Sequence, residues 1–171
     1  MTAAYLFFAY LLGSIPTSVW IGKVFYNIDV REFGSGNAGA TNTFRVLGKR
    51  AGIPVLILDI VKGSAAVALA WLSDIDPSGK EFIHLQMGLG IAALMGHIFP
   101  VFAGFRGGKG VATMLGIVIC IAPVSCALSL LVFLVVLFAS RIVSLSSMIA
   151  GVSFPIVLNF VMGNTEPILT V

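Results

Sequence analysis

Five apolar stretches, each long enough to cross a lipid bilayer, constrain this chain more than any other feature of its sequence. A helix needs ~20 mostly apolar residues to cross a hydrocarbon core of ~30 Å, where lipid offers its backbone no hydrogen-bond partner. With 58% hydrophobic and only 10% charged residues, the chain has too little polar surface for a soluble fold. The sequence therefore predicts an all-α, multi-pass membrane helix bundle, with apolar stretches at about residues 3–25, 51–72, 82–101, 111–139 and 143–162.

The fourth stretch is long for one crossing and short for two. Pro123 interrupts it near its middle, because proline lacks an N–H and clashes with the preceding helical turn. Two short helices in a tight hairpin would place Arg141 on the cytoplasmic side, whereas one tilted helix would place it outside. We favour the hairpin and predict about six spans in a single transmembrane domain, residues 1–171, with both termini outside.

Charge predicts the side of each loop, because basic residues next to span ends stay preferentially in the cytoplasm. Loop 27–50 carries four Arg or Lys residues and glycine-rich loop 104–110 carries two, so both are predicted to be cytoplasmic. Loop 73–81 carries three acidic residues against one lysine and is predicted outside, as is the tail 163–171. The formal net charge of +3 is too small to indicate a nucleic-acid partner.

The polar segment 34–45 has the composition of an anion-binding loop. Glycine permits positive φ and close approach to a ligand, while successive amides and hydroxyls form a concavity that a guanidinium can complete. The same composition also fits a flexible loop. Its G-x-G-x-x-G pattern follows a membrane span instead of a strand, which argues against a dinucleotide site. The candidate binding groups are Ser35, Gly36, Asn37, Thr41, Asn42 and Arg45.

A second candidate site covers residues 96–113. Its glycines immediately precede the apolar run that begins at Val111, so free amides and the positive end of a helix dipole would face a ligand. The alternative is a tight turn whose cations obey the positive-inside rule. The candidate groups are Arg106, Gly107, Gly108, Lys109, Gly110 and Thr113.

Four further residues carry polar groups next to or within apolar stretches. His97 could act as a general base or as a hydrogen-bond donor to a phosphate, or it could be a hydrogen-bonded structural residue. Asp59 and Lys62 share one helical face and are expected to pair, either to hold the bundle or to support the site. Ser144, shortly after Arg141, would add a hydroxyl.

The chain lacks the sequence patterns of common hydrolases and of His–Asp acyltransferases. It contains neither a G-x-S-x-G nucleophile elbow nor an H-E-x-x-H metal pair. A reaction here would therefore depend on positioning and anion stabilisation, or on a proton acceptor supplied by the substrate.

These motifs resemble the bacterial acyl-phosphate:glycerol-3-phosphate acyltransferase family. Residues 34–42 are similar to its first motif and residues 97–113 to its second, and 58–63 and 141–144 also fit, in the family's order. The resemblance implies transfer of a fatty acyl group from acyl phosphate to the 1-hydroxyl of sn-glycerol 3-phosphate, forming lysophosphatidic acid and phosphate. It also implies a bacterial cytoplasmic (inner) membrane location, a proton accepted by the donor's phosphate, and no metal or organic cofactor.

The same resemblance assigns roles to individual residues. Ser35, Arg45 and Lys109 would bind substrate phosphate, and His97, Asn37 and Lys109 are the candidate catalytic groups. Thr41, Thr113 and Ser144 would surround them. The implied partners are the two substrates, membrane lipid and the soluble enzyme that makes acyl phosphate.

Family members have a seventh span and a third motif that residues 1–171 do not contain, so we expect a truncated or divergent member. Two other interpretations stay open. The chain could be a small transporter or channel whose path is lined by Asp59 and Lys62. It could also be a non-catalytic membrane partner of the acyl-phosphate-making enzyme.

Overall fold

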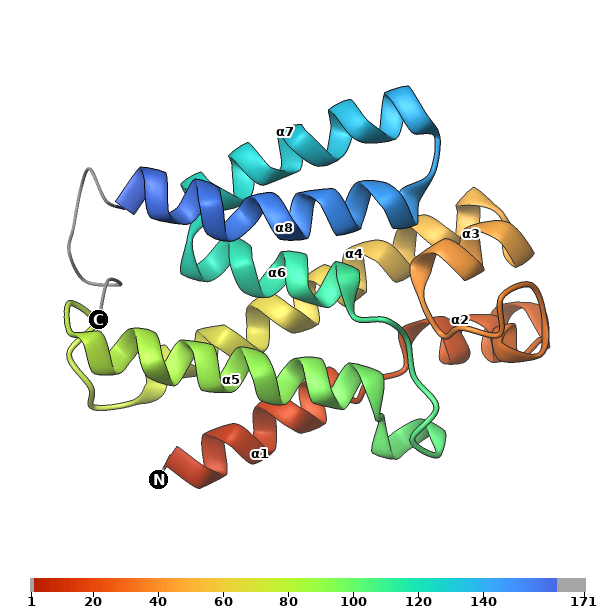
Figure 1. The fold of residues 1–171 in the computed structure, drawn as a ribbon. Helices are drawn as coiled ribbons and strands as arrows, with labels where there is room; N and C mark the ends of the chain where they lie inside the picture. The colour runs from red at the N-terminus through yellow and green to blue at the C-terminus, as the bar shows by residue number, and fades with distance from the viewer. Residues whose placement is uncertain (1, 163–171) are drawn as a thin grey trace. The chain divides into compact units, whose positions relative to one another are not determined.

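The computed structural model describes residues 2–162, and every regular element among them is a helix, which confirms the predicted all-α class. The chain divides into two compact units, Met1–Ile121 and Ala122–Val171, which are described separately. Figure 1 shows the order of the helices. Five helical segments of the described residues are long and apolar enough to cross a membrane, and α6 (Val111–Ile121) is a shorter apolar helix. The five are Thr2–Tyr26, Lys49–Leu72, Lys80–Ala103, Pro123–Ser140 and Val143–Val161.

The first span is broken near its middle, although the sequence pattern predicted one continuous apolar stretch at about residues 3–25. Helix α1 (Thr2–Gly13) ends before Pro16, and α2 (Thr17–Tyr26) begins directly after it. Proline fixes its own φ and lacks an N–H, so it begins a helix more readily than it continues one. The break leaves the carbonyl of Ile15 available to a side chain from another helix.

Segment 27–50 was expected to be a polar loop and contains two helical pieces. They are η1 (Val30–Glu32) and α3 (Ala40–Leu47). The hydroxyl of Thr43 donates to the Gly39 carbonyl at 3.1 Å, at the start of α3. The ring of Phe44 packs on Gly52, where a side chain would overlap it. Helix α3 therefore carries the second half of the polar segment 34–45.

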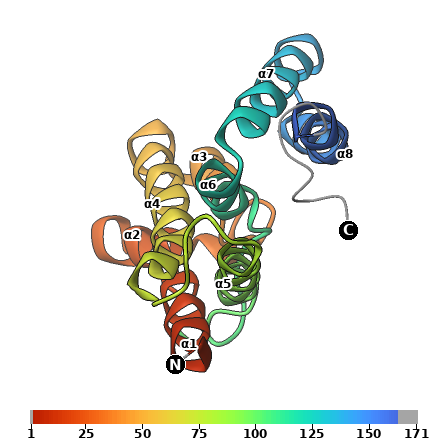
Figure 2. The same ribbon diagram turned by 90° about the vertical axis from the view of Figure 1, so that its left-hand side faces the viewer.

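Helix α4 (Lys49–Ala68) packs against α6, α5 and α1, and α5 (Lys80–Ile98) packs against α1. Figure 2 shows these four helices grouped within the first unit. Between α4 and α6 the backbones approach closely, because Gly63 faces the carbonyl of Thr113 and Gly116 faces the carbonyl of Ile60. The hydroxyl of Ser64 also donates to the Gly116 carbonyl at 2.9 Å. Small residues permit such contacts between membrane helices.

The buried apolar cluster of the first unit lies between α1, α4 and α5, near η2 (Leu69–Leu72). Its members are Ala9, Ala66, Ala70, Phe82, Leu85, Leu89 and Ala93. The rings of Phe82 and Trp71 meet edge to face, 4.9 Å apart. Other large apolar side chains, such as Ile57 and Ile91, are more than half exposed, as expected for surfaces that face lipid.

The described part of the second unit consists of α7 (Pro123–Ser140) and α8 (Val143–Met162), which pack against each other. Helix α6 ends at Ile121 and α7 starts at Pro123, so the helix boundary lies where the proline predicted it. Arg141 ends α7 with a left-handed φ of 57°. The predicted tail 163–171 lies outside the described residues.

Candidate functional site

The two glycine-rich segments predicted to bind anions meet at one end of the first unit. The amide of Ala38 donates to the carbonyl of Gly107, with a nitrogen–oxygen distance of 3.4 Å. A Cβ on Gly108 would lie 2.9 Å from the Ala38 carbonyl oxygen and would overlap Nε2 of His97. In Figure 1 the loop between α4 and α5 lies at the opposite end of this unit. We call residues 34–45 and 104–110 together the loop cradle.

The second half of the cradle is folded back onto the end of α5. The amide of Gly107 donates to the Ile98 carbonyl at 3.1 Å, and that of Gly108 donates to the His97 carbonyl at 3.2 Å. Gly110 has a left-handed φ of 77°, and α6 begins at the next residue. A glycine is needed there, because other L-residues rarely adopt that conformation. The cradle's second half therefore leads directly into a helix N-terminus, as predicted, but the amides of Gly107 and Gly108 are bonded to α5 and are not free for a ligand as expected.

Asn42 shapes the first half of the cradle. Its buried side-chain amide donates to the carbonyls of Val30 and Phe33 at 2.8 and 3.1 Å. Its carbonyl oxygen accepts from the amide of Ser35 at 2.9 Å. The sequence had placed Asn42 among the ligand-binding groups. These three bonds instead make it an internal brace that holds Ser35 in position.

Six other predicted residues have side chains without a hydrogen bond or ion pair to any described residue. All but the half-buried Asn37 are exposed. Backbone amides in both halves of the cradle are equally free within the described chain, including those of Gly39 and Lys109. Free amides, hydroxyls and cationic side chains on two adjoining loops can bind an anionic ligand. The six residues are Ser35, Asn37, Thr41, Arg45, Arg106 and Lys109.

A buried ion pair lies behind the cradle. Nζ of Lys62 is 2.9 Å from Oδ1 of Asp59, which confirms the predicted pairing. The same carboxylate oxygen accepts a hydrogen bond from the Thr17 hydroxyl at 2.7 Å. The ammonium also donates to the Ile15 carbonyl at 2.8 Å, at the break between α1 and α2. The pair therefore ties α4 to the first span.

His97 connects this ion pair to the cradle. Its Nδ1 lies 3.1 Å from the Thr113 hydroxyl and 3.7 Å from Oδ1 of Asp59, and all three residues are buried. Its Nε2 faces Gly108. Only the Nε2 side of the imidazole is therefore next to the cradle, and Thr113 holds the other side.

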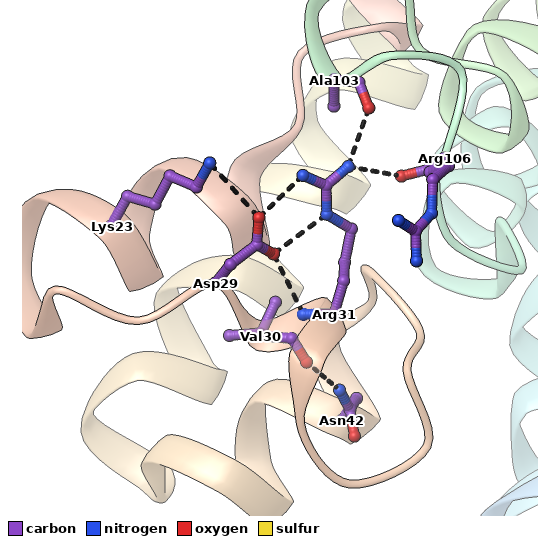
Figure 3. A network of polar contacts seen from close by, with 7 residues as sticks. All are labelled: Lys23, Asp29, Val30, Arg31, Asn42, Ala103 and Arg106. Atoms are coloured by element: carbon purple, nitrogen blue, oxygen red, sulfur yellow. Dashed lines mark hydrogen bonds and ion pairs between the residues drawn. The ribbon is translucent and has the colours of Figure 1, made fainter.

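Sequence reasoning missed a second polar network, centred on Arg31 and Asp29. Nε and one terminal nitrogen of Arg31 donate to the two carboxylate oxygens of Asp29 at 2.9 and 2.7 Å. Figure 3 shows the guanidinium between this carboxylate and the carbonyls of Ala103 and Arg106. The hydrogen bond from Arg31 holds the pKa of Asp29 well below its usual range, and Asp29 raises the pKa of Arg31. The only sequence signal was an acid and a base two positions apart.

Ser144 and Arg141 belong to the second unit. Ser144 is exposed in the first turn of α8, and Arg141 is exposed just before that helix. Their predicted part in substrate binding stays a prediction.

The comparisons with known proteins agree with this architecture. The profile described as glycerol-3-phosphate acyltransferase matches residues 3–171. Glycerol-3-phosphate acyltransferases of Enterococcus faecalis and of Bacillus cereus (strain G9842) are both 51% identical to this chain, over 84% and 89% of its length. The matched part spans 64% and 74% of those two relatives.

Two solved structures have the same fold as this chain. Both are of PlsY (YgiH), an integral membrane glycerol 3-phosphate acyltransferase, in its glycerol 3-phosphate form and its lysophosphatidic acid form. The first superposes with a TM-score of 0.83 and 41% identity, covering 95% of this chain and 78% of that one. The second gives 0.79 and 40%, covering 95% and 77%. The chain described here therefore belongs to the glycerol-3-phosphate acyltransferase family.

Proposed function

We propose that this protein transfers a fatty acyl group from an acyl phosphate to the 1-hydroxyl of sn-glycerol 3-phosphate, in phospholipid biosynthesis. The products are lysophosphatidic acid and inorganic phosphate. Family membership supports glycerol 3-phosphate as acceptor, and the related PlsY structures are a glycerol 3-phosphate form and a lysophosphatidic acid form. The observation that carries the proposal is the loop cradle, where amides and three cations without protein partners meet at the end of apolar helices.

The chemistry of an acyl phosphate suits a site of this kind. The acceptor's O1 attacks the acyl carbon, a carbon–oxygen ester bond forms, and the bond from the acyl carbon to the phosphate oxygen breaks. The hydroxyl proton goes to the departing phosphate, so the step balances without a protein base. Both substrates carry phosphate, and groups positioned in advance on that charge stabilise the transition state. A fatty chain can stay in lipid while its phosphate lies in the cradle.

We assign roles to individual residues from the unbonded groups of the cradle and from the family resemblance. We assign Lys109 and Asn37 to the reacting phosphate and acyl groups. His97 would act from behind the glycine loop, through the Nε2 that faces Gly108. The other predicted groups would hold the two phosphates and the acceptor hydroxyls. They are Ser35, Gly36, Thr41, Arg45, Arg106, Gly107, Gly108 and Gly110, while the buried Thr113 would hold Nδ1 of His97.

We also propose that the cradle faces the cytoplasm from a bacterial cytoplasmic membrane. Loops 27–50 and 104–110 carry the excess of basic residues, and loop 73–81 carries the acidic ones. The position of loop 73–81 at the opposite end of the first unit supports this orientation (Figure 1). A soluble enzyme that makes acyl phosphate could then deliver its product directly.

The test is phosphate release by the purified chain in a lipid mesophase, supplied with palmitoyl phosphate with and without glycerol 3-phosphate. We expect acceptor-dependent release, and a loss of about 100-fold in Arg45→Gln and Lys109→Gln, because each removes a charge from the anion site. Lys49→Gln is the matched control, since Lys49 is exposed at the start of α4, close to Arg45 in the sequence but outside the cradle. A version extended by downstream coding sequence should be assayed in parallel.

The other interpretations make different predictions. A transporter would move solute across sealed vesicles without forming lysophosphatidic acid. A non-catalytic partner would show no turnover in either version, and Lys109→Gln would still bind the acyl-phosphate-making enzyme. Either result would overturn the proposed reaction.

A further inference from the structure

We infer that Arg31 is a positioning residue that fixes the spacing between the two halves of the loop cradle. The inference rests on the proposed function, since it treats the two halves as parts of one substrate site. Arg31 itself lies outside the cradle, in η1, and its guanidinium contacts none of the free groups described above. Any effect on catalysis would therefore pass through the loops that it joins.

The Arg31 side chain binds one partner on each side. Toward its own loop, it makes the paired hydrogen bonds to Asp29, whose carboxylate also accepts from the Arg31 amide at 3.1 Å. Toward the other loop, its remaining terminal nitrogen donates to the Ala103 carbonyl at 2.7 Å and to the Arg106 carbonyl at 3.3 Å. The side chains of Arg31 and Asp29 are only 14% and 11% exposed. Charge-assisted hydrogen bonds sheltered from water are stronger than neutral ones.

Few other hydrogen bonds join these loops. Between residues 27–39 and 101–110 of the described chain, the hydrogen bonds are the two from Arg31 and the longer one between Ala38 and Gly107. The Arg31 guanidinium is therefore the principal tie between the two halves.

The two carbonyls that Arg31 binds enclose the turn that starts the second half of the cradle. Between them lie Gly104 and Phe105, with left-handed φ values of 63° and 60°. Phe105 is held there although non-glycine residues rarely adopt this conformation. Fixing the Arg106 carbonyl also fixes where the following Gly107–Gly108 backbone begins. Arg31 thus sets both the distance between the halves and the direction of the second half.

A lysine cannot reproduce this arrangement. Its single ammonium is a point charge without the planar fork that bonds a carboxylate on one edge and two carbonyls on the other. Arg31→Lys and Arg31→Gln should therefore both loosen the cradle, with Arg31→Lys as the milder change. We expect the KM for glycerol 3-phosphate to rise about tenfold in Arg31→Gln, the size of losing one net charge-assisted hydrogen bond, with a smaller change in kcat.

Lys23→Gln is the matched control. Nζ of Lys23 lies 3.2 Å from the same Asp29 carboxylate, but this side chain is 57% exposed and has no contact with the second loop (Figure 3). We expect its KM to stay at the wild-type value. An equal rise in KM for Lys23→Gln and Arg31→Gln would overturn the inference, because the effect would then follow from charge loss near Asp29 and not from the tie.

A distance measurement tests the tie without any enzyme activity. Nitroxide labels on Glu32→Cys and Phe105→Cys, both exposed positions, would report the separation of the loops in a Cys120→Ser/Cys126→Ser background. Adding Arg31→Gln should broaden or shift the distance distribution, whereas Lys23→Gln should leave it narrow. If Arg31→Gln cannot be purified in a folded state, the distance distribution of Arg31→Lys is measured instead.

The two readouts separate failure of the inference from failure of the proposed function. The wild-type chain could lack acyltransferase activity while the Arg31 substitution still broadens the nitroxide distance distribution. That result would contradict the proposed reaction but support the positioning role of Arg31. An unchanged distribution would overturn the positioning role of Arg31, even if its variants lost activity.

Discussion

Nζ of Lys62 lies 2.9 Å from Oδ1 of Asp59, one helical turn earlier on α4, and the two side chains are only 6% and 1% exposed. The second carboxylate oxygen of Asp59 has no hydrogen-bond partner among the described residues. Lys62 and Thr17 satisfy the first oxygen, and Lys62 also satisfies the Ile15 carbonyl. The ion pair lies within α4, and its hydrogen bonds with Thr17 and Ile15 join this helix to the broken first span.

Removing one member of this pair should destabilise the protein strongly. Asp59→Asn or Lys62→Met would leave a buried charge without its partner, which is expected to lower the free energy of unfolding by about 3–5 kcal/mol. The double variant should lose less than the sum of the two single losses, because no charge is left unpaired. Unfolding in detergent, followed by tryptophan fluorescence, measures both. Single variants as stable as the wild type would contradict the prediction.

The close contact between α4 and α6 should not tolerate a methyl group. In Gly116→Ala the new Cβ would overlap the Ile60 carbonyl, so the helices must separate, at a cost of about 1–3 kcal/mol of unfolding free energy. Gly151→Ala on α8 is the control, because nothing lies within 4 Å of its Cβ position. Melting temperatures of the two variants in the same detergent give the comparison, and equal values would exclude the close contact.

Gly108→Ala should reduce activity more than it reduces stability. The added Cβ would overlap Nε2 of His97 and approach the Ala38 carbonyl, which displaces the glycine loop from the first half of the cradle. Misplacing a binding group by about 1 Å can cost on the order of 100-fold in rate. Gly88→Ala on α5 is a control, since its Cβ would make an ordinary 3.5 Å contact with Leu6. Wild-type kcat/KM in Gly108→Ala would show that the loops need not touch.

Asp29 should make stability depend on pH in the acidic range. Its pKa is lowered chiefly by the hydrogen bond from Arg31, so the folded protein keeps the carboxylate charged at pH values where the unfolded chain takes up a proton. The stabilisation is therefore complete above the unfolded pKa of about 3.9 and is lost progressively as the pH falls below it. The melting temperature should fall with pH over this range, and less steeply in Asp29→Asn.

Asp76→Asn is the control for this pH dependence. The pKa of Asp76 is also lowered, by the backbone amide of Ser78, but the side chain is exposed to water, which weakens such interactions. Its substitution should leave the slope of melting temperature against pH unchanged. An equal change in slope for both variants would show that the Arg31–Asp29 contact is not what stabilises the fold.

The apolar stretches and one of the two helix breaks could be predicted from the sequence. Pro123 lies in the middle of an over-long stretch, so length and chemistry both marked it as a boundary. Pro16 lies in a stretch of ordinary length, so nothing required a break there. The break is stabilised locally by the Thr17 amide and from another helix by Lys62, both of which donate to the Ile15 carbonyl. Lys62 and Ile15 are 47 positions apart, so no local sequence pattern indicates that they are in contact.

The candidate site was likewise predictable from the sequence only in part. The pairing of Asp59 with Lys62 follows from their helical spacing, and the left-handed turn at Gly110 just before α6 follows from the glycines. The internal role of Asn42 depends on carbonyls up to a dozen positions away in a folded loop. The contacts of Arg31 with Ala103 and Arg106 depend on the packing of two distant loops. Composition identifies such residues as polar but cannot say which are already bonded.

The bond from Lys62 to the Ile15 carbonyl also bears on biogenesis. Backbone groups without partners in hydrocarbon cost several kcal/mol each, so a first span that is broken at Pro16 is less stable in the bilayer while it is alone. Within this span the Ile15 carbonyl accepts from the Thr17 amide at 3.0 Å, and Lys62, synthesised later, adds a second, charged donor together with Asp59, which offsets its charge. The N-terminal segment should therefore settle in its final position only after α4 has left the ribosome and entered the membrane beside it.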